Sequence, residues 1–182
     1  MNICVFCASS SSVKEPYISA ARELGEQIGK RGHNLVFGGY DSGLMGVVSH
    51  AVHDAGGKVI GVVPDDVSKF KTRKIFPCDE LHEVENISRR KDLMSSNADA
   101  FVAAPGGFGT LDELYEVLVE QKLSSGAKKP IAIYNFDGYY DTLEQMTHQM
   151  VEKGFVPAED LNLFFVTSDP EQIVKGLEER LA

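Results

Sequence analysis

Short apolar runs alternate along the chain with segments in which apolar residues recur every three or four positions. The runs predict strands, because a strand buried on both faces reads as a nearly continuous apolar stretch. The recurrence predicts amphipathic helices. The predicted strands are residues 3–7, 34–37, 58–63, 98–104, 130–134 and 163–166, with a weaker one at 80–85. The predicted helices are residues 16–30, 42–55, 87–96, 111–123, 139–153 and 170–181.

The regular alternation of strand and helix predicts an α/β fold with a doubly wound, Rossmann-like sheet. Such a sheet is mostly parallel and carries helices on both faces. A chain of 182 residues suits a single domain, residues 1–182, with a full hydrophobic core. Residues 64–79 are the one irregular insertion, and their many charges favour a solvated loop over a flap that covers a ligand.

Charge and composition narrow the classes of partner. The net charge of −9 argues against nucleic acids and anionic membranes, since both require a basic face. No run approaches the roughly 18 apolar residues of a membrane span. The first residues enter a strand directly, without the basic region of a signal peptide, and three cysteines do not suggest a disulfide framework. Together these features predict a cytoplasmic protein.

Turns of small or polar residues follow four of the predicted strands, at residues 8–12, 38–46, 64–66 and 105–110. In a doubly wound sheet, ligands bind beyond the carboxyl ends of the strands. Four such turns at one edge predict a pocket of nucleotide size. The Gly-x-Gly-x-x-Gly fingerprint follows neither the first strand nor the second, which argues against NAD. We therefore predict that the protein does not use NAD.

The stretch at residues 105–113, Pro-Gly-Gly-Phe-Gly-Thr-Leu-Asp-Glu, carries the most chemical information. It joins a predicted strand to a predicted helix. Its glycines let the backbone come close to a ligand, and the first N–H groups of the helix favour an anion. Glu113 lies one turn further on, so the stretch predicts a phosphate cradle beside a carboxylate. Thr110 and Glu113 also match a capping box, with Thr110 as the N-cap, but a cap does not require the glycines.

Three cations, Arg89, Arg90 and Lys91, fall in the first turns of the helix that Asn86 is predicted to cap. The helix dipole disfavours each of them there by about 0.3–1 kcal/mol. A bound phosphate or a nearby carboxylate would offset that cost. For Arg89 we favour a simple solvated position.

Two patterns that suggest metal or redox chemistry have simpler interpretations. Cys4 and Cys7 match Cys-x-x-Cys but lie in one predicted strand, where residues three apart point to opposite faces, so both are predicted to be core residues. His50 and His53 lie three apart on a helix without an apparent third ligand, so no metal site is predicted.

These motifs together resemble the lonely guy (LOG) family of cytokinin riboside 5′-monophosphate phosphoribohydrolases, over nearly the whole chain. The most specific motif is Pro-Gly-Gly-x-Gly-Thr-x-x-Glu at residues 105–113, with the Arg90-Lys91 pair upstream. Residues 5–10, 43–46 and 137–140 also match. Members are often labelled lysine decarboxylases, but no lysine here is placed for the Schiff base that pyridoxal chemistry requires.

The resemblance implies hydrolysis of the N-glycosidic bond of an N6-modified adenosine 5′-monophosphate, giving the free base and ribose 5-phosphate. It implies Arg90 and Glu113 as the catalytic pair, with Arg90 holding Glu113 ionised or binding substrate oxygens. It further implies a homodimer that uses no metal and no cofactor. The residues implied to bind this AMP-like substrate are Ser9, Gly39, Lys91, Gly106, Gly107, Gly109 and Thr110.

Three departures from the family pattern leave the preferred base open. They are Ser88 in place of a histidine, Tyr40 in place of a third glycine, and residues 119–123 in place of a stretch that contains tryptophan. Two alternatives therefore stand beside the cytokinin-activating enzyme. One is a broader nucleosidase acting on AMP and other nucleoside 5′-monophosphates. The other is a carrier that binds a nucleotide or the molybdenum cofactor without reaction.

Overall fold

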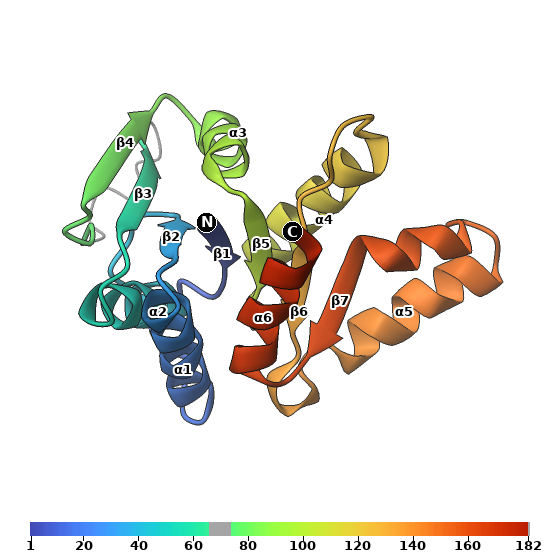
Figure 1. The fold of residues 1–182 in the computed structure, drawn as a ribbon, viewed down its shortest axis with the longest axis horizontal. Coiled ribbons are helices and arrows are strands. Elements are labelled where there is room, and N and C mark those ends of the chain that lie inside the picture. Colours follow the sequence, from blue (N-terminus) through green and yellow to red (C-terminus); the bar gives the residue numbers. More distant parts are fainter. Residues whose placement is uncertain (66–73, 182) are drawn as a thin grey trace.

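Seven strands form one sheet in the computed structural model, which describes residues 1–65 and 74–181 (Figure 1). Their order is β4-β3-β2-β1-β5-β6-β7, and each neighbouring pair is parallel. The strands are β1 (Asn2–Phe6), β2 (Asn34–Phe37), β3 (Val59–Pro64), β4 (Glu80–Val84), β5 (Ala100–Ala103), β6 (Ile131–Tyr134) and β7 (Phe164–Thr167). The predicted parallel sheet is confirmed.

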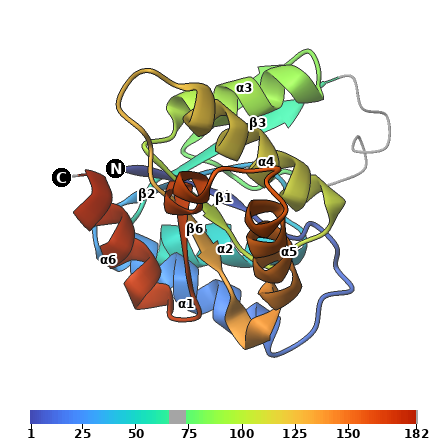
Figure 2. The same cartoon turned by 90° about the vertical axis from the view of Figure 1, so that its right-hand side faces the viewer.

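Helices cover both faces of the sheet (Figure 2). One face packs against α1 (Tyr17–Lys30), α2 (Gly43–Asp54) and α6 (Pro170–Leu181), and the other against α3 (Ile87–Asn97), α4 (Phe108–Leu123) and α5 (Asp141–Glu152). The two cores that result contain Leu24, Val48 and Ile173 on the first face, and Met94 and Leu114 on the second. This is the doubly wound arrangement that the alternating pattern predicts.

The order of the strands reverses between β1 and β5. The chain leaves β1 toward α1 on one face and leaves β5 toward α4 on the other face. The two departing turns still touch, because the Ala8 amide donates a hydrogen bond of 3.1 Å to the Pro105 carbonyl oxygen. A crevice at such a switch point is where doubly wound sheets bind their ligands.

The predicted irregular insertion at residues 64–79 differs in part from expectation. Residues 74–79 are mostly exposed, as a solvated loop would be, but Phe76 is buried, and Ile75 forms an antiparallel bridge with Tyr40. Burial of the Phe76 side chain explains the difference, because the charged residues around it in the sequence suggest exposure of the whole segment. The alternative of a flap concerns residues 66–73, which lie outside the described residues.

Across the two described ranges, no helix combines the length and the apolar character needed to cross a membrane.

Candidate active site

A cavity of about 360 Å³ lies at the switch point of the sheet. All four predicted turns contribute to its wall, as do the first turns of α3 and α4. The residues that line it are Cys7, Ala8, Ser9, Ser10, Tyr40, Met45, Pro64, Ile87, Arg90, Lys91, Gly107, Gly109, Thr110, Asp112 and Glu113. The predicted convergence of the turns is therefore confirmed, with Asp66 of the third turn outside the described residues.

Arg90 and Glu113, 23 positions apart in the chain, meet in this cavity. The Arg90 Nη1 atom lies 3.1 Å from the Glu113 Oε1 atom, and Arg90 Nε donates to the Val62 carbonyl oxygen at 3.1 Å. Their side chains are only 15% and 12% exposed. Helix α3 supplies the guanidinium and α4 the carboxylate, and the pair can meet because both helices pack on the same face of the sheet.

Burial raises the pKa of Glu113 above its ordinary value, and the Arg90 guanidinium opposes this without cancelling it. The expectation that Arg90 holds Glu113 ionised thus describes only the smaller of two opposing effects. Burial and the nearby Glu113 likewise raise the pKa of Cys7, which leaves that thiol neutral in the cavity wall. A carboxyl group with a raised pKa is better suited to exchange protons near neutral pH.

Helix α4 begins three residues earlier than predicted, at Phe108, and its N-cap is Gly107. Thr110 as the N-cap of a capping box is therefore wrong. The pattern misled because Thr110 and Glu113 both lie inside the helix, where residues three apart share a face. No side chain caps this terminus, and within residues 1–65 and 74–181 the amides of Phe108, Gly109 and Thr110 make no hydrogen bond.

The open N-terminus of α4 is the structural counterpart of the predicted phosphate cradle. A Cβ atom added at Gly107 or Gly109 would meet nothing within 4 Å, so the packing of the chain does not require glycine there. Gly106 differs, because a Cβ atom there would overlap the Thr110 side chain. Two of the three glycines thus leave space for something other than the protein, beside free N–H donors.

Two tyrosines brace this turn, in roles that the sequence motifs do not indicate. The Tyr139 hydroxyl donates to the Gly106 carbonyl oxygen at 2.7 Å, and the Tyr140 hydroxyl donates to the Ala104 carbonyl oxygen at 2.8 Å. Both follow β6 and lie within residues 137–140, one of the segments that carries the family resemblance. That match was the only signal that could have indicated them.

Lys91 lies at the edge of the cavity with its ammonium group already paired. It is 3.0 Å from the Asp112 carboxylate and forms a second ion pair with Glu116. Partial burial lowers its pKa, but hydrogen bonds to the two carboxylates outweigh that effect and raise it overall. Substrate binding by Lys91 stays a prediction; the pairing shown here docks α3 on α4.

Ser9 and Gly39 occupy different positions. Ser9 lines the cavity, whereas Gly39 is not among the lining residues; its φ is +78°, and a Cβ atom built on it would overlap the Val63 side chain. In the turn that contains Gly39, the amides of Leu44 and Met45 both donate to the Ala8 carbonyl oxygen. The N-terminus of α2 is therefore occupied by the protein itself, which favours a packing role for this second glycine turn.

The Cys-x-x-Cys pattern and the His50–His53 pair do not form a redox or metal site in the described residues. Cys4 and Cys7 are buried in the cores on opposite faces of the sheet, as predicted. The His50 ring lies 3.1 Å from Asp41, and the His53 ring 4.0 Å from Asp79. In the described part of the chain, no group of three or more His, Cys, Asp or Glu residues could hold a metal ion.

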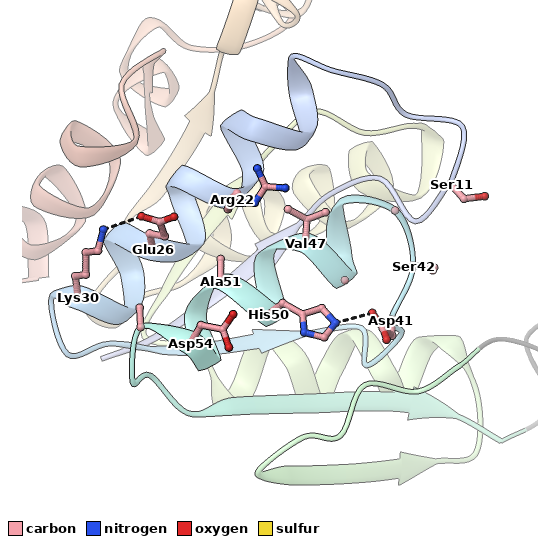
Figure 3. A pocket seen from close by; sticks show the side chains of 13 residues that line it. Ser11, Arg22, Glu26, Lys30, Asp41, Ser42, Val47, His50, Ala51 and Asp54 are labelled. Carbon is pink, nitrogen blue, oxygen red and sulfur yellow. Dashed lines mark hydrogen bonds and ion pairs between the residues drawn. The ribbon is translucent and has the colours of Figure 1, made fainter.

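A larger hollow of about 660 Å³ lies between α1 and α2 and contains none of the predicted site residues (Figure 3). Two pairs of its polar side chains contact each other: Lys30 with Glu26 at 2.7 Å, and His50 with Asp41 at 3.1 Å. The smaller cavity, with the Arg90–Glu113 pair and the open helix terminus, is therefore the candidate active site.

Solved structures share this fold. The molybdenum cofactor carrier protein of Chlamydomonas reinhardtii superposes with a TM-score of 0.76 at 23% identity, over 99% of this chain and 97% of that one. The molybdenum cofactor binding protein of Rippkaea orientalis gives 0.75 at 22% identity, over 100% and 97%. At this level of identity the likeness establishes the fold alone.

Relatives of higher sequence identity establish the family as well as the fold. A family model described as "possible lysine decarboxylase" matches residues 45–177. The cytokinin riboside 5′-monophosphate phosphoribohydrolase LOG of Oryza sativa subsp. japonica is 41% identical over 97% of this chain and 72% of its own length. The phosphoribohydrolase LOG4 of Arabidopsis thaliana is 40% identical over 97% and 81%. The chain therefore belongs to the LOG family, whose family model carries the description of a possible lysine decarboxylase.

Proposed function

We propose that the protein hydrolyses the N-glycosidic bond of an adenosine 5′-monophosphate carrying an N6 substituent, releasing the free base and ribose 5-phosphate. The names of the plant relatives support this reaction class. The observation that carries the proposal is that Arg90 and Glu113 face the same cavity as the open N-terminus of α4. One cavity is thus lined by both an anion cradle and a buried carboxylate.

The 5′-phosphate would bind at the amides of Phe108, Gly109 and Thr110, where the helix dipole favours negative charge. Anchoring the phosphate would place the ribose over Glu113. The binding energy of the phosphate, which does not itself react, would thereby orient the glycosidic bond. The transition state of glycosidic cleavage resembles an oxocarbenium ion. Glu113 would stabilise that cation or take a proton from the attacking water, and such general base catalysis typically contributes about 10²–10⁴-fold.

Arg90 would orient Glu113 through its 3.1 Å contact and keep a second face free for substrate oxygens. A planar guanidinium can serve both purposes, because its donors point in several fixed directions. Its Nε atom is held by the Val62 carbonyl oxygen, which prevents rotation of the group away from the carboxylate.

The site does not support the chemistry of a lysine decarboxylase. A Schiff-base lysine needs a lowered pKa to attack as a free amine. Lys91, the lysine that lines the described cavity, is paired with Asp112 and Glu116, and its pKa is raised. We therefore propose no role for pyridoxal phosphate.

The test is to incubate purified protein with AMP, N6-isopentenyl-AMP and adenosine, and to quantify the released base by chromatography. The proposal expects release from the nucleotides and at least tenfold less from adenosine at equal concentration, because adenosine lacks the anchoring phosphate. Equal turnover of AMP and adenosine would contradict the phosphate cradle.

A broader nucleoside 5′-monophosphate nucleosidase is the second candidate, and Tyr40 favours it. This side chain lines the cavity and is only 5% exposed, at a position where the family pattern has glycine. Bulk at this place would restrict the room for an N6 substituent. A higher kcat/KM for AMP than for N6-isopentenyl-AMP would support the broader activity.

We also propose that two copies associate and that the protein acts in the cytoplasm. Phe108, Val119 and Leu123 lie on one stripe of α4 and are 93%, 52% and 76% exposed. Apolar stripes of this kind commonly mark protein interfaces. Light scattering should give a dimer for the wild type and a monomer for Val119→Asp.

All three cysteines are free thiols, which suits a reducing compartment such as the cytoplasm.

A further inference from the structure

We propose that Gly38 is a positioning residue, whose missing side chain provides the seat for the Arg90 guanidinium. The proposal rests on the proposed function only in taking Arg90 as part of the catalytic pair. Gly38 directly follows β2, at the carboxyl edge of the sheet, and the cavity lies immediately beyond it.

The geometry of the seat is defined on three sides. A Cβ atom built on Gly38 would overlap the Arg90 Nη2 atom and would lie 2.9 Å from Arg90 Cζ. On the other sides, Arg90 Nε donates to the Val62 carbonyl oxygen and Nη1 contacts Glu113, both at 3.1 Å. The guanidinium thus rests directly on the Gly38 backbone, with the cavity as its open side.

The requirement for glycine at this position concerns Arg90 rather than the backbone. Gly38 is not among the glycines with positive φ, so alanine fits the local conformation. The other close atom is Met45 Cε, at 2.6 Å, which also ends a flexible side chain. The neighbouring Gly39 is the opposite case, since its φ is +78° and a side chain there would be strained whatever the space.

Alanine at position 38 should therefore leave the fold intact and move the guanidinium into the cavity. The displaced group would lose its contact with Glu113 or with the Val62 carbonyl oxygen, and it would take space from the substrate. We expect kcat to fall at least tenfold, with a smaller rise in KM, because the group that is moved acts on the reacting bond.

The experiment compares Gly38→Ala with a matched control, Gly126→Ala, in which the nearest atom to the added Cβ lies 3.8 Å away. It also places both changes in an Arg90→Lys background, because lysine lacks the Nη2 atom. The proposal predicts a loss of at least tenfold for Gly38→Ala in the wild type, no further loss beyond twofold in Arg90→Lys, and no loss for Gly126→Ala. Such non-additivity marks two residues that act through one contact.

The proposal would be overturned by an equal loss in both backgrounds, or by a melting temperature that falls as far as that of Gly39→Ala. The ¹⁵N NMR signal of the Arg90 Nε–H group gives a readout independent of activity. Gly38→Ala should shift this signal, and Gly126→Ala should not. If the wild type releases no base, the proposed function fails, but this signal still tests whether Gly38 seats the Arg90 guanidinium. A signal unchanged by Gly38→Ala would overturn the seat and leave the proposed function untouched.

Discussion

Substituting alanine for Gly109 should have opposite effects on stability and on substrate binding. Gly109 is the second residue of α4, it is exposed, and its backbone does not have positive φ. An added Cβ atom meets nothing within 4 Å. Alanine therefore gains helix propensity without a clash, and the free energy of unfolding should rise by about 0.5–1 kcal/mol.

The same methyl group would stand where the proposed phosphate approaches the N–H groups of α4. A hydrogen bond to a charged group contributes about 1.5–3 kcal/mol, so losing one corresponds to roughly a 10- to 150-fold rise in KM for AMP. Adenosine has no phosphate, and its weak turnover should stay unchanged.

Urea denaturation gives the change in stability, and initial rates of base release give KM. Gly126→Ala is the control, because that glycine does not line the cavity and the nearest atom to its added Cβ lies 3.8 Å away. A Gly109→Ala variant that is more stable and keeps its KM for AMP would refute the reasoning that this glycine faces the phosphate.

Three further perturbations test other parts of the account. Tyr140→Phe removes a buried hydrogen bond to the turn before α4 and should lower the free energy of unfolding by about 1–2 kcal/mol in urea; an unchanged value would contradict the bracing role. Burial is the main cause of the raised pKa of Glu113, but Asp112 adds to it and Lys91 opposes it. Since activity requires the carboxylate, which exists above its pKa, Asp112→Asn should move the acidic limb of kcat/KM to lower pH and Lys91→Met to higher pH; shifts of the reverse sign would contradict this. Gly25→Ala should destabilise the protein by about 1–3 kcal/mol despite its better helix propensity, because its Cβ would lie 2.7 Å from a backbone oxygen of α2; a gain in thermal stability would refute the close packing.

Much of the fold was predictable because each element carries a complete local signal. The core strands read as apolar runs, and the stripe on α1 follows the helical period, so their order alone defines the doubly wound sheet. The pairing of Arg90 with Glu113 was predictable only through the family resemblance. Nothing in the spacing of 23 residues indicates that the two side chains meet.

The errors came from contacts that local pattern does not contain. The start of α4 depends on Gly107 as its N-cap, and a threonine followed three residues later by a glutamate gave a competing local signal. Phe76 lies in a segment whose charges predict solvent exposure. It is nevertheless buried against Phe37 of β2, which is distant in sequence. The seat at Gly38 likewise depends on where α3 crosses the edge of the sheet.

The most direct test of the central claim is to measure base release from AMP and N6-isopentenyl-AMP by the wild type and by Glu113→Gln, with nucleotide binding followed in parallel by calorimetry. Glutamine keeps the size of the side chain and an acceptor for Arg90, but it carries no charge and cannot take up a proton. The account predicts that Glu113→Gln binds both nucleotides and that release falls by at least 10²-fold. Release at the wild-type rate by Glu113→Gln, or a wild type that binds both nucleotides and cleaves neither, would contradict it.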